Sequence, residues 1–275
     1  MENFIQDLFE ILLCIFGTFM YYLFMNSSLF EVIQYCDERL NIEAIADEER
    51  ACNGLQFQNS GEINKIAAAV DASLEVIEKA AAIEANFLIV HHGLFWGATI
   101  PIRDAVYEKY KYLIAHDIAL YSCHLPLDAH PEIGNNAILA KILGLTNTAQ
   151  EFEFHHAKIG MTGNRSIERS KFKSLLQSTF PHVVAMEFGP NVIDKVGIVS
   201  GSSGVIIAQA KDLAIHTVVI GECQQYYYNV AQENKVNAYA CGHYATEIFG
   251  VQALGKEVSQ KFSLPFEFIA TDCPL

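Results

Sequence analysis

The chain has 275 residues, of which 51% are hydrophobic and 18% charged; this composition excludes a disordered or fibrous protein and suits one large or two modest domains. Its 18 basic and 32 acidic residues leave a formal charge of −14. Because this charge repels phosphate backbones, we expect no nucleic-acid partner and favour as ligand a cation, or a small substrate that binds together with a cation. The seven cysteines are scattered and form no C-x-x-C pair, which argues against disulfides or a zinc ribbon and favours the reducing cytoplasm.

An apolar stretch, residues 11–25, lies near the beginning of the sequence. It is shorter than the about 20 residues that a membrane-spanning helix needs, and no Lys or Arg before Arg39 marks a signal peptide or an anchor. Three interpretations stay open: membrane attachment through residues 4–25, a helix packed on the body or a partner, or an extension, residues 1–24, upstream of a working start at Met25. Membrane contact is expected only if that extension is retained.

After Met25, short apolar runs alternate with amphipathic stretches. A first helix is expected to begin near Ser27. Further helices are expected at 73–84, 105–115, 205–214 and 243–258, and strands at 65–71, 87–90, 118–123, 196–200, 217–220 and 237–241. This alternation predicts an α/β fold with mixed, mostly parallel sheets.

The two halves of the body repeat the same order of features. In the first half VDAS, a helix and LIVHH lead to SCH, and in the second VSGSSG, a helix and VVIGE lead to ACGH. His124 is followed four residues later by Asp128, and His243 is followed four residues later by Glu247. These parallels indicate an internal duplication.

The duplication predicts two α/β repeats, residues 25–150 and 151–275, joined near the polar stretch 144–158. In such folds, ligands bind at the carboxyl ends of strands and in clefts between units. We therefore expect the functional site in the cleft between the repeats.

Two adjacent histidines, His91 and His92, directly follow the apolar run FLIV. Neighbouring side chains of a regular strand point to opposite faces, so both can serve one site only where the strand ends and the chain bends. Gly93 can supply that bend. The alternative is a turn with two solvated histidines.

Two carboxylates have comparable positions. Pro126 is expected to stop the preceding strand, so that a loop brings Asp128 close to the strand tip. His243 and Glu247 lie one turn apart on one face of a predicted helix, as in histidine-pair metal motifs. The alternatives are a turn-forming aspartate and a capping histidine with an exposed glutamate.

Together these residues mix imidazole nitrogen with carboxylate oxygen. They exceed what one tetrahedral ion with an open position needs, and two ions bridged by a carboxylate and a water would use them all. Because cysteine is absent from the set, zinc, manganese or iron(II) is the expected metal. The predicted metal ligands are His91, His92, Asp128, His243 and Glu247.

Six motifs connect this sequence to a known family. They are NGLQ at 53–56, VDAS at 70–73, LIVHHGLFW at 88–96, SCHLPLD at 122–128, IGE at 220–222 and GHYATE at 242–247. In order and spacing they resemble the Nif-three-like family, whose members are often labelled GTP cyclohydrolase 1 type 2 homologues, from about residue 25 to the end of the sequence.

This resemblance implies two interlocked α/β repeats, a ring-shaped homohexamer and a dinuclear metal site formed by the same five residues, with Glu247 as the bridge. One stretch departs from the family, where relatives commonly carry TGE-xx-HH and this chain has IGECQQYYY at 220–228. His124 and Glu222 remain near the implied site, where we expect proton-transfer or ligand-supporting roles.

Two functions follow as hypotheses. The first is a metal-dependent hydrolase that acts on a small anionic substrate, with Glu222 or His124 moving the proton. The resemblance suggests that the reaction opens a purine-type ring in a nucleotide. Hydrolysis of a phosphate ester suits the same ligand set equally. The second is a non-catalytic metal-binding scaffold or regulatory partner, which the departure at 225–228 suggests.

Overall fold

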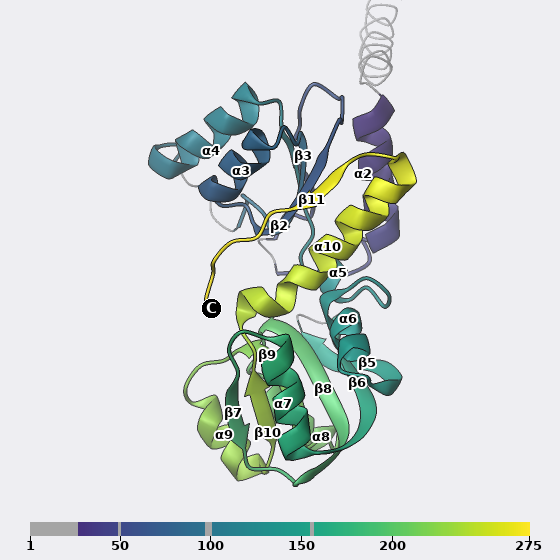
Figure 1. Ribbon diagram of the computed structural model, residues 1–275, viewed down its shortest axis with the longest axis vertical. Coiled ribbons are helices and arrows are strands. Elements are labelled where there is room, and N and C mark those ends of the chain that lie inside the picture. Colours follow the sequence, from purple (N-terminus) through teal and green to yellow (C-terminus); the bar gives the residue numbers. More distant parts are fainter. Residues whose placement is uncertain (1–26, 49–50, 97–100, 155–156) are drawn as a thin grey trace, which may run out of the picture.

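The computed structural model describes residues 27–48, 51–96, 101–154 and 157–275. Two β-sheets with helices on both faces form two lobes, and helix α10 (His243–Phe262) crosses between them (Figure 1). The apolar extension, residues 1–24, lies outside the described residues, so the structure tests none of its three interpretations. Within the described ranges, no helix is both long and apolar enough to cross a membrane.

The first sheet has the strand order β1-β4-β3-β2-β11. All neighbouring strands in it are parallel except β1, which runs antiparallel to β4. The strands are β1 (Gly54–Phe57), β2 (Ile66–Asp71), β3 (Phe87–His92), β4 (Ala119–Ser122) and β11 (Phe266–Phe268).

Alternating side chains of this sheet fill two cores, because successive residues of a strand point to opposite faces. Leu88 packs with buried residues of helices α3 (Leu74–Ala82) and α4 (Asp104–Ala115). Ile89 packs on the opposite face with α10 and α2 (Ser27–Leu40). Three layers result. The Ser73 hydroxyl caps α3, because it accepts a hydrogen bond from the Val76 N–H.

The second sheet has the strand order β5-β6-β8-β9-β10-β7. Its neighbours β8, β9 and β10 are parallel, and the outer pairings are antiparallel. The strands are β5 (Thr146–Phe154), β6 (Ala157–Glu168), β7 (Val184–Glu187), β8 (Val192–Ser202), β9 (Thr217–Glu222) and β10 (Asn237–Ala240). One face packs on α8 (Ile206–Asp212) and α9 (Tyr227–Asn234), the other on α6 (Asn135–Ile142) and α7 (Arg169–Thr179).

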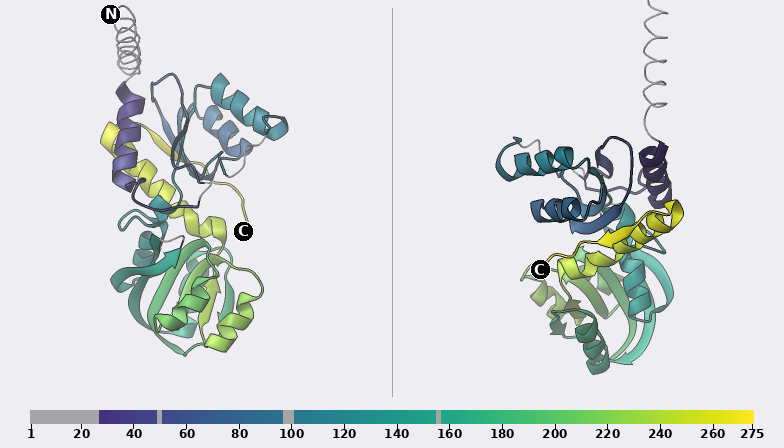
Figure 2. Two further views of the ribbon diagram at one scale, coloured as in Figure 1. Left: turned by 180° about the vertical axis from the view of Figure 1, so that it is seen from behind. Right: turned by 45° about the horizontal axis from the view of Figure 1, so that its top comes forward.

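The duplicated α/β fold is confirmed. The units β2-α3-β3-α4-β4 and β8-α8-β9-α9-β10 have the same order, and each ends beside an antiparallel edge strand, β1 or β7. The repeats are interlocked, because the chain after α10 returns to the first lobe and adds β11 beside β2 (Figure 2). Helix α10 itself contacts strands of both sheets.

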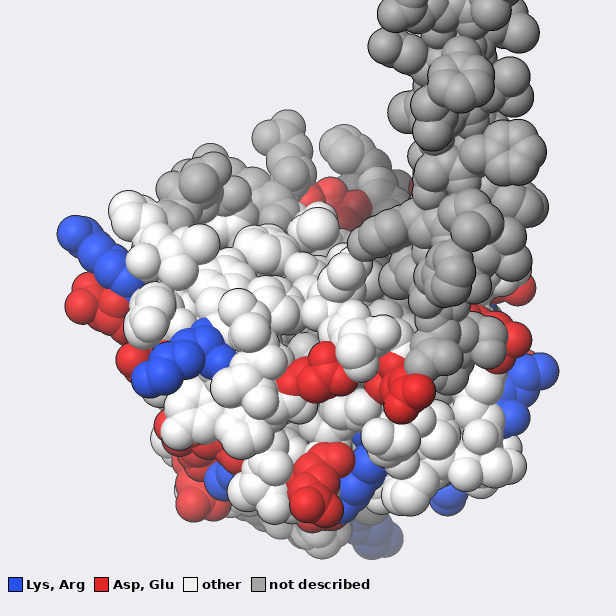
Figure 3. Space-filling model, turned by 90° about the horizontal axis from the view of Figure 1, so that it is seen from above, with Lys and Arg blue, Asp and Glu red and all other residues white. Residues whose placement is uncertain are grey.

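Antiparallel strands escaped the sequence patterns. The expected join at 144–158 contains β5, an edge strand that is mostly exposed and therefore has no apolar run. The division between residues 150 and 151 stays a prediction, although residue 150 lies within β5. On the face seen in Figure 3, acidic and basic side chains are interspersed.

Candidate metal centre

The paired histidines lie at the carboxyl end of β3. Strand β3 extends two residues beyond its expected end, so that it includes both histidines and stops before Gly93. Pairing of β3 with β4 ends at Val90, which faces Ser122, so β4 does not flank the two imidazoles. Their ring centroids lie only 4.8 Å apart. Both rings therefore reach the same site from a regular strand.

Asp128 lies in one turn of helix, α5 (Leu125–Asp128), rather than in the expected loop. Pro126 is accommodated there because the first helical turn needs no N–H donor from it. Asn135 Nδ2 and Ser200 Oγ donate hydrogen bonds to Asp128 Oδ1 at 2.8 and 3.1 Å. The other oxygen, Oδ2, is 3.4 Å from His91 Nε2.

Helix α10 supplies the remaining two predicted ligands. It begins at His243 directly after Gly242, and Glu247 follows one turn later. His243 Nε2 lies 3.1 Å from Glu247 Oε2, and the glutamate is 3% exposed. The start of the helix is fixed against the second sheet, because Thr246 Oγ1 accepts a hydrogen bond from the Gly201 N–H.

Glu247 lies at the centre of the site. Its Oε1 is 3.6 Å from His91 Nε2, and its Oε2 is 3.5 Å from His92 Nε2. Groups of three side chains whose ligand atoms lie within 4.8 Å of one another could each hold a metal ion. These groups are His91, Asp128 and Glu247; His92, His243 and Glu247; and His91, His92 and His124. The first two share Glu247.

Each of these four histidines is held through Nδ1 by an oxygen atom. The partners are the Cys123 carbonyl for His91, Asp71 for His92, Asp47 for His124 and Glu222 for His243, at 2.8, 2.8, 2.8 and 2.9 Å. In the neutral ring, an acceptor at Nδ1 places the N–H there and leaves the lone pair at Nε2. The four rings therefore present their second nitrogen as a metal ligand or proton acceptor.

The two predicted catalytic residues have different positions. His124 lines the same cavity as the carboxylates, and its ring centroid is 5.0 Å from that of His91. Glu222 contacts the far nitrogen of His243, and its side chain is 45% exposed. This contact orients the imidazole, as metal-supporting carboxylates do.

Sequence patterns missed the supporting residues Asp47, Asp71 and Asn135. The position of Asp71 could have indicated its role, because it is the last residue of β2 and pairs in register with His92 on β3. Asn135 accepts a hydrogen bond from the Gly250 N–H besides donating to Asp128, so it ties the carboxylate to α10. Asp47 lies outside the helices and strands and had no pattern to mark it.

The donor set fits a cation. Among the buried side-chain atoms of the described residues, His91 Nε2 and Glu247 Oε2 have no hydrogen-bond partner. Such an unpaired atom normally costs about 1–3 kcal/mol. A metal ion would satisfy both atoms. Space beside them is kept open by Gly201, because a Cβ at that position would clash with Glu247 Oε1.

The electrostatics of the site also demand positive charge. Burial lowers the pKa of His91, but the carboxylates of Asp128 and Glu247 outweigh it and hold that pKa well above its ordinary value. Burial likewise lowers the pKa of His243, yet Glu247 and Glu222 raise it to about 9. Burial raises the pKa of Glu247, but the surrounding histidines outweigh it and leave it well below its usual range.

Four of the five predicted ligands, His92, Asp128, His243 and Glu247, line a cavity of about 170 Å³. Trp96 forms part of its wall, with its ring edge-to-face with His124 at 4.8 Å between centroids, and is 40% exposed. Gly201 and Ser202, at the end of β8, and the following Ser203 also line the cavity. This volume holds metal ions and a few waters but is below the about 300–1,000 Å³ of typical small-molecule pockets.

The chain is similar to one family model and to several proteins from bacteria and archaea. The model described as Duf34/NIF3 (NGG1p interacting factor 3) matches residues 27–274. A Deinococcus radiodurans protein is 38% identical over 243 residues, which cover 87% of this chain and 91% of that protein. A Pyrococcus horikoshii protein is 40% identical over 243 residues, which cover 87% of this chain and 96% of that protein. Both are named GTP cyclohydrolase 1 type 2 homolog.

Solved structures share the fold. The protein ybgI, described as of unknown function, superposes with a TM-score of 0.84 at 33% identity, over 90% of this chain and 100% of that one. A Thermus thermophilus protein superposes with a TM-score of 0.82 at 32% identity, over 89% of this chain and 98% of that one.

We expect Gly201→Ala to abolish metal binding, because the added methyl group displaces Glu247. Gly144→Ala is the matched control, since the φ angles of the two glycines are +65° and +64° and only the tip of Arg165 meets its new methyl group. Both substitutions should cost about 1–2 kcal/mol of backbone strain. Metal content after dialysis against zinc, measured by mass spectrometry, should fall only for Gly201→Ala; equal content in both would refute the geometry.

Metal binding should release protons below about pH 9. Histidine must be neutral to coordinate a metal. The raised pKa of His243 means that, without a metal, its ring is the doubly protonated cation at neutral pH. Affinity should therefore rise with pH, by about tenfold per unit for each displaced proton, and level off above the pKa. Calorimetry in buffers of different ionisation enthalpy measures the release, and a pH-independent affinity between pH 6 and 9 would contradict it.

Proposed function

Because the chain belongs to the Duf34/NIF3 family, we propose that it is a metal-dependent hydrolase with two divalent ions at the site around Glu247. The observation that supports two ions is the shared carboxylate: its two oxygens face different histidine sets. His91 and Asp128 would hold one ion, and His92 and His243 the other. Nitrogen and oxygen donors without thiolate suit zinc, manganese or iron(II).

Divalent ions at such a site supply Lewis acidity and make water a nucleophile near neutral pH. The side chains of the protein orient the imidazole rings and balance the charge of the ions. Asp128 and Glu247 offset the charge of the ions, and the hydrogen bonds at Nδ1 fix each imidazole. His124 is the proton acceptor that we favour, because its Nδ1 is bonded to Asp47 and its ring borders the cavity. Glu222 acts through His243, by holding its ring.

The substrate we propose is a small anionic metabolite or nucleotide. The names of the relatives point to hydrolysis of a purine-type ring, and a phosphate ester is compatible with the same ligands. The buried carboxylates would repel an anion unless the ions were present, so substrate binding should depend on the metal. The ring-shaped homohexamer is part of the same proposal.

Charge-removing variants of the shared and unshared carboxylates test the number of ions. Glu247→Gln should reduce bound metal from two equivalents to fewer than one, because both ions lose a ligand. Asp128→Asn should remove one equivalent, and both should lower hydrolysis by about 100-fold or more. Exposed Glu233→Gln and Asp212→Asn are the matched controls. Elemental analysis and phosphatase, nucleotidase and cyclohydrolase assays measure the outcome; full activity in both site variants would exclude this mechanism.

A metal-holding scaffold is the alternative, and the small volume around the ligands favours it. Glu222→Gln separates the two functions, because this side chain supports His243 from outside the cavity. A hydrolase should keep most of its metal and lose about 10-fold or more in turnover. A scaffold should have no turnover in the native protein, whatever the metal content. Turnover by metal-loaded native protein that falls in this variant therefore excludes the scaffold.

A further inference from the structure

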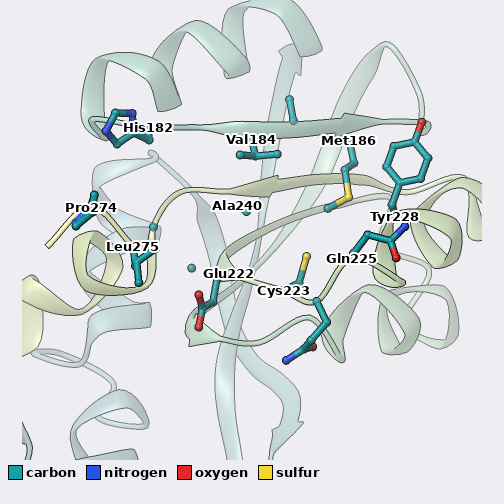
Figure 4. Close-up of a pocket in the computed structure, with 14 residues that line it drawn as sticks. His182, Val184, Met186, Glu222, Cys223, Gln225, Tyr228, Ala240, Pro274 and Leu275 are labelled. Carbon is teal, nitrogen blue, oxygen red and sulfur yellow. The ribbon is translucent and has the colours of Figure 1, made fainter.

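A second and larger pocket adjoins the candidate metal centre. It has a volume of about 560 Å³, within the range of small-molecule sites. Figure 4 shows Val184 and Met186 on β7 across from Glu222 and Cys223, with Leu275 at one end and Tyr228 at the other. Apart from Glu222, which holds the His243 ring, none of these residues has a role in the proposed metal chemistry.

The walls of this pocket are mainly apolar. Met186 is 7% exposed, and Val184 and Tyr228 are 65% and 47% exposed at its mouth. The Tyr228 ring packs edge-to-face against Phe188 at 5.2 Å between centroids, which holds it in place. Aromatic rings and a methionine thioether make favourable contacts with planar rings. The amide of Gln225 also lines the pocket and can hydrogen-bond to the edge of such a ring.

The pocket and the metal centre share a thin wall. Glu222 lines the pocket and is bonded to His243, which borders the metal cavity. Gly221 also lines the pocket and lies against the backbone of Gly201, a residue of the metal cavity; a Cβ on Gly221 would lie 2.5 Å from the Gly201 carbonyl oxygen. Both spaces are open to solvent on one side, so a molecule that occupies both would pass over the rim of this wall.

We propose that this pocket binds the uncharged aromatic ring of a small molecule whose anionic group lies at the metal centre. The proposal rests on the proposed function, since the metal cavity alone has room for little more than ions and such a group. The carboxylate of Glu222 at the pocket rim disfavours a second anion there. The substrate is thereby assigned to the aryl or heteroaryl anions.

Phenylphosphonate and methylphosphonate are the probes, because they share a non-hydrolysable anionic group and differ in the ring. On metal-loaded protein, calorimetry should show phenylphosphonate binding about tenfold or more tighter. Val184→Trp fills the mouth of the pocket and should remove this preference. Val192→Trp is the matched control, since Val192 is also an exposed valine of the second sheet, 54% exposed, and does not line the pocket. Methylphosphonate should bind all three proteins equally.

Indole, which carries no anionic group, reports the pocket alone on metal-free protein. Its saturation-transfer signal should be strong in native and Val192→Trp protein and lost in Val184→Trp. Equal affinities for the two phosphonates, or equal indole signals in all three proteins, overturn the proposal. Failure of both phosphonates to bind, with indole binding intact, instead overturns the proposed metal-centre function. A change of oligomeric mass in Val184→Trp without a change in probe binding assigns the face to contacts between copies and also overturns the proposal.

Discussion

The candidate metal centre depends on two buried carboxylates whose negative charge must be balanced by positive charge. Asp128 and Glu247 are 5% and 3% exposed, and histidine nitrogens are the nearest charge partners of both. Burial of an anion costs several kcal/mol unless a cation compensates it. Protonated histidines offer partial compensation, and that need explains the raised pKa values of His91 and His243. A divalent ion would serve the same need without occupying the nitrogen with a proton.

The duplicated fold brings these charges together. Strand β3 ends at His92, and the corresponding β9 ends at Glu222, so the two repeats present their strand tips to one cleft. The shared carboxylate belongs to neither sheet. It lies in the first turns of α10, which packs against strands of both lobes. The packing of α10 against both sheets therefore sets the distance of His243 and Glu247 from the two histidines of β3.

The sequence predicted the α/β elements around the site closely, because each has a buried apolar run or an amphipathic period. The five suggested ligands, which the structure brings together, were marked by their places relative to those runs: His91 and His92 follow one directly, and Asp128, His243 and Glu247 lie shortly beyond the ends of two others. Asp47 lies outside any element, and Asn135 acts across 115 residues on the Gly250 N–H, so neither had a local pattern. The edge strand β5 was missed because an exposed polar strand depends on its neighbour β6 for pairing.

The position of β11 has a consequence for how the chain acquires its structure. Strand β11 is the last strand of the first sheet to leave the ribosome, so the edge of β2 stays unpaired until the chain has been synthesised beyond residue 268. Contacts between segments about 200 residues apart slow folding, because their loop-closure entropy must be overcome first. During translation, the amino-terminal lobe is therefore the half that most needs protection from aggregation.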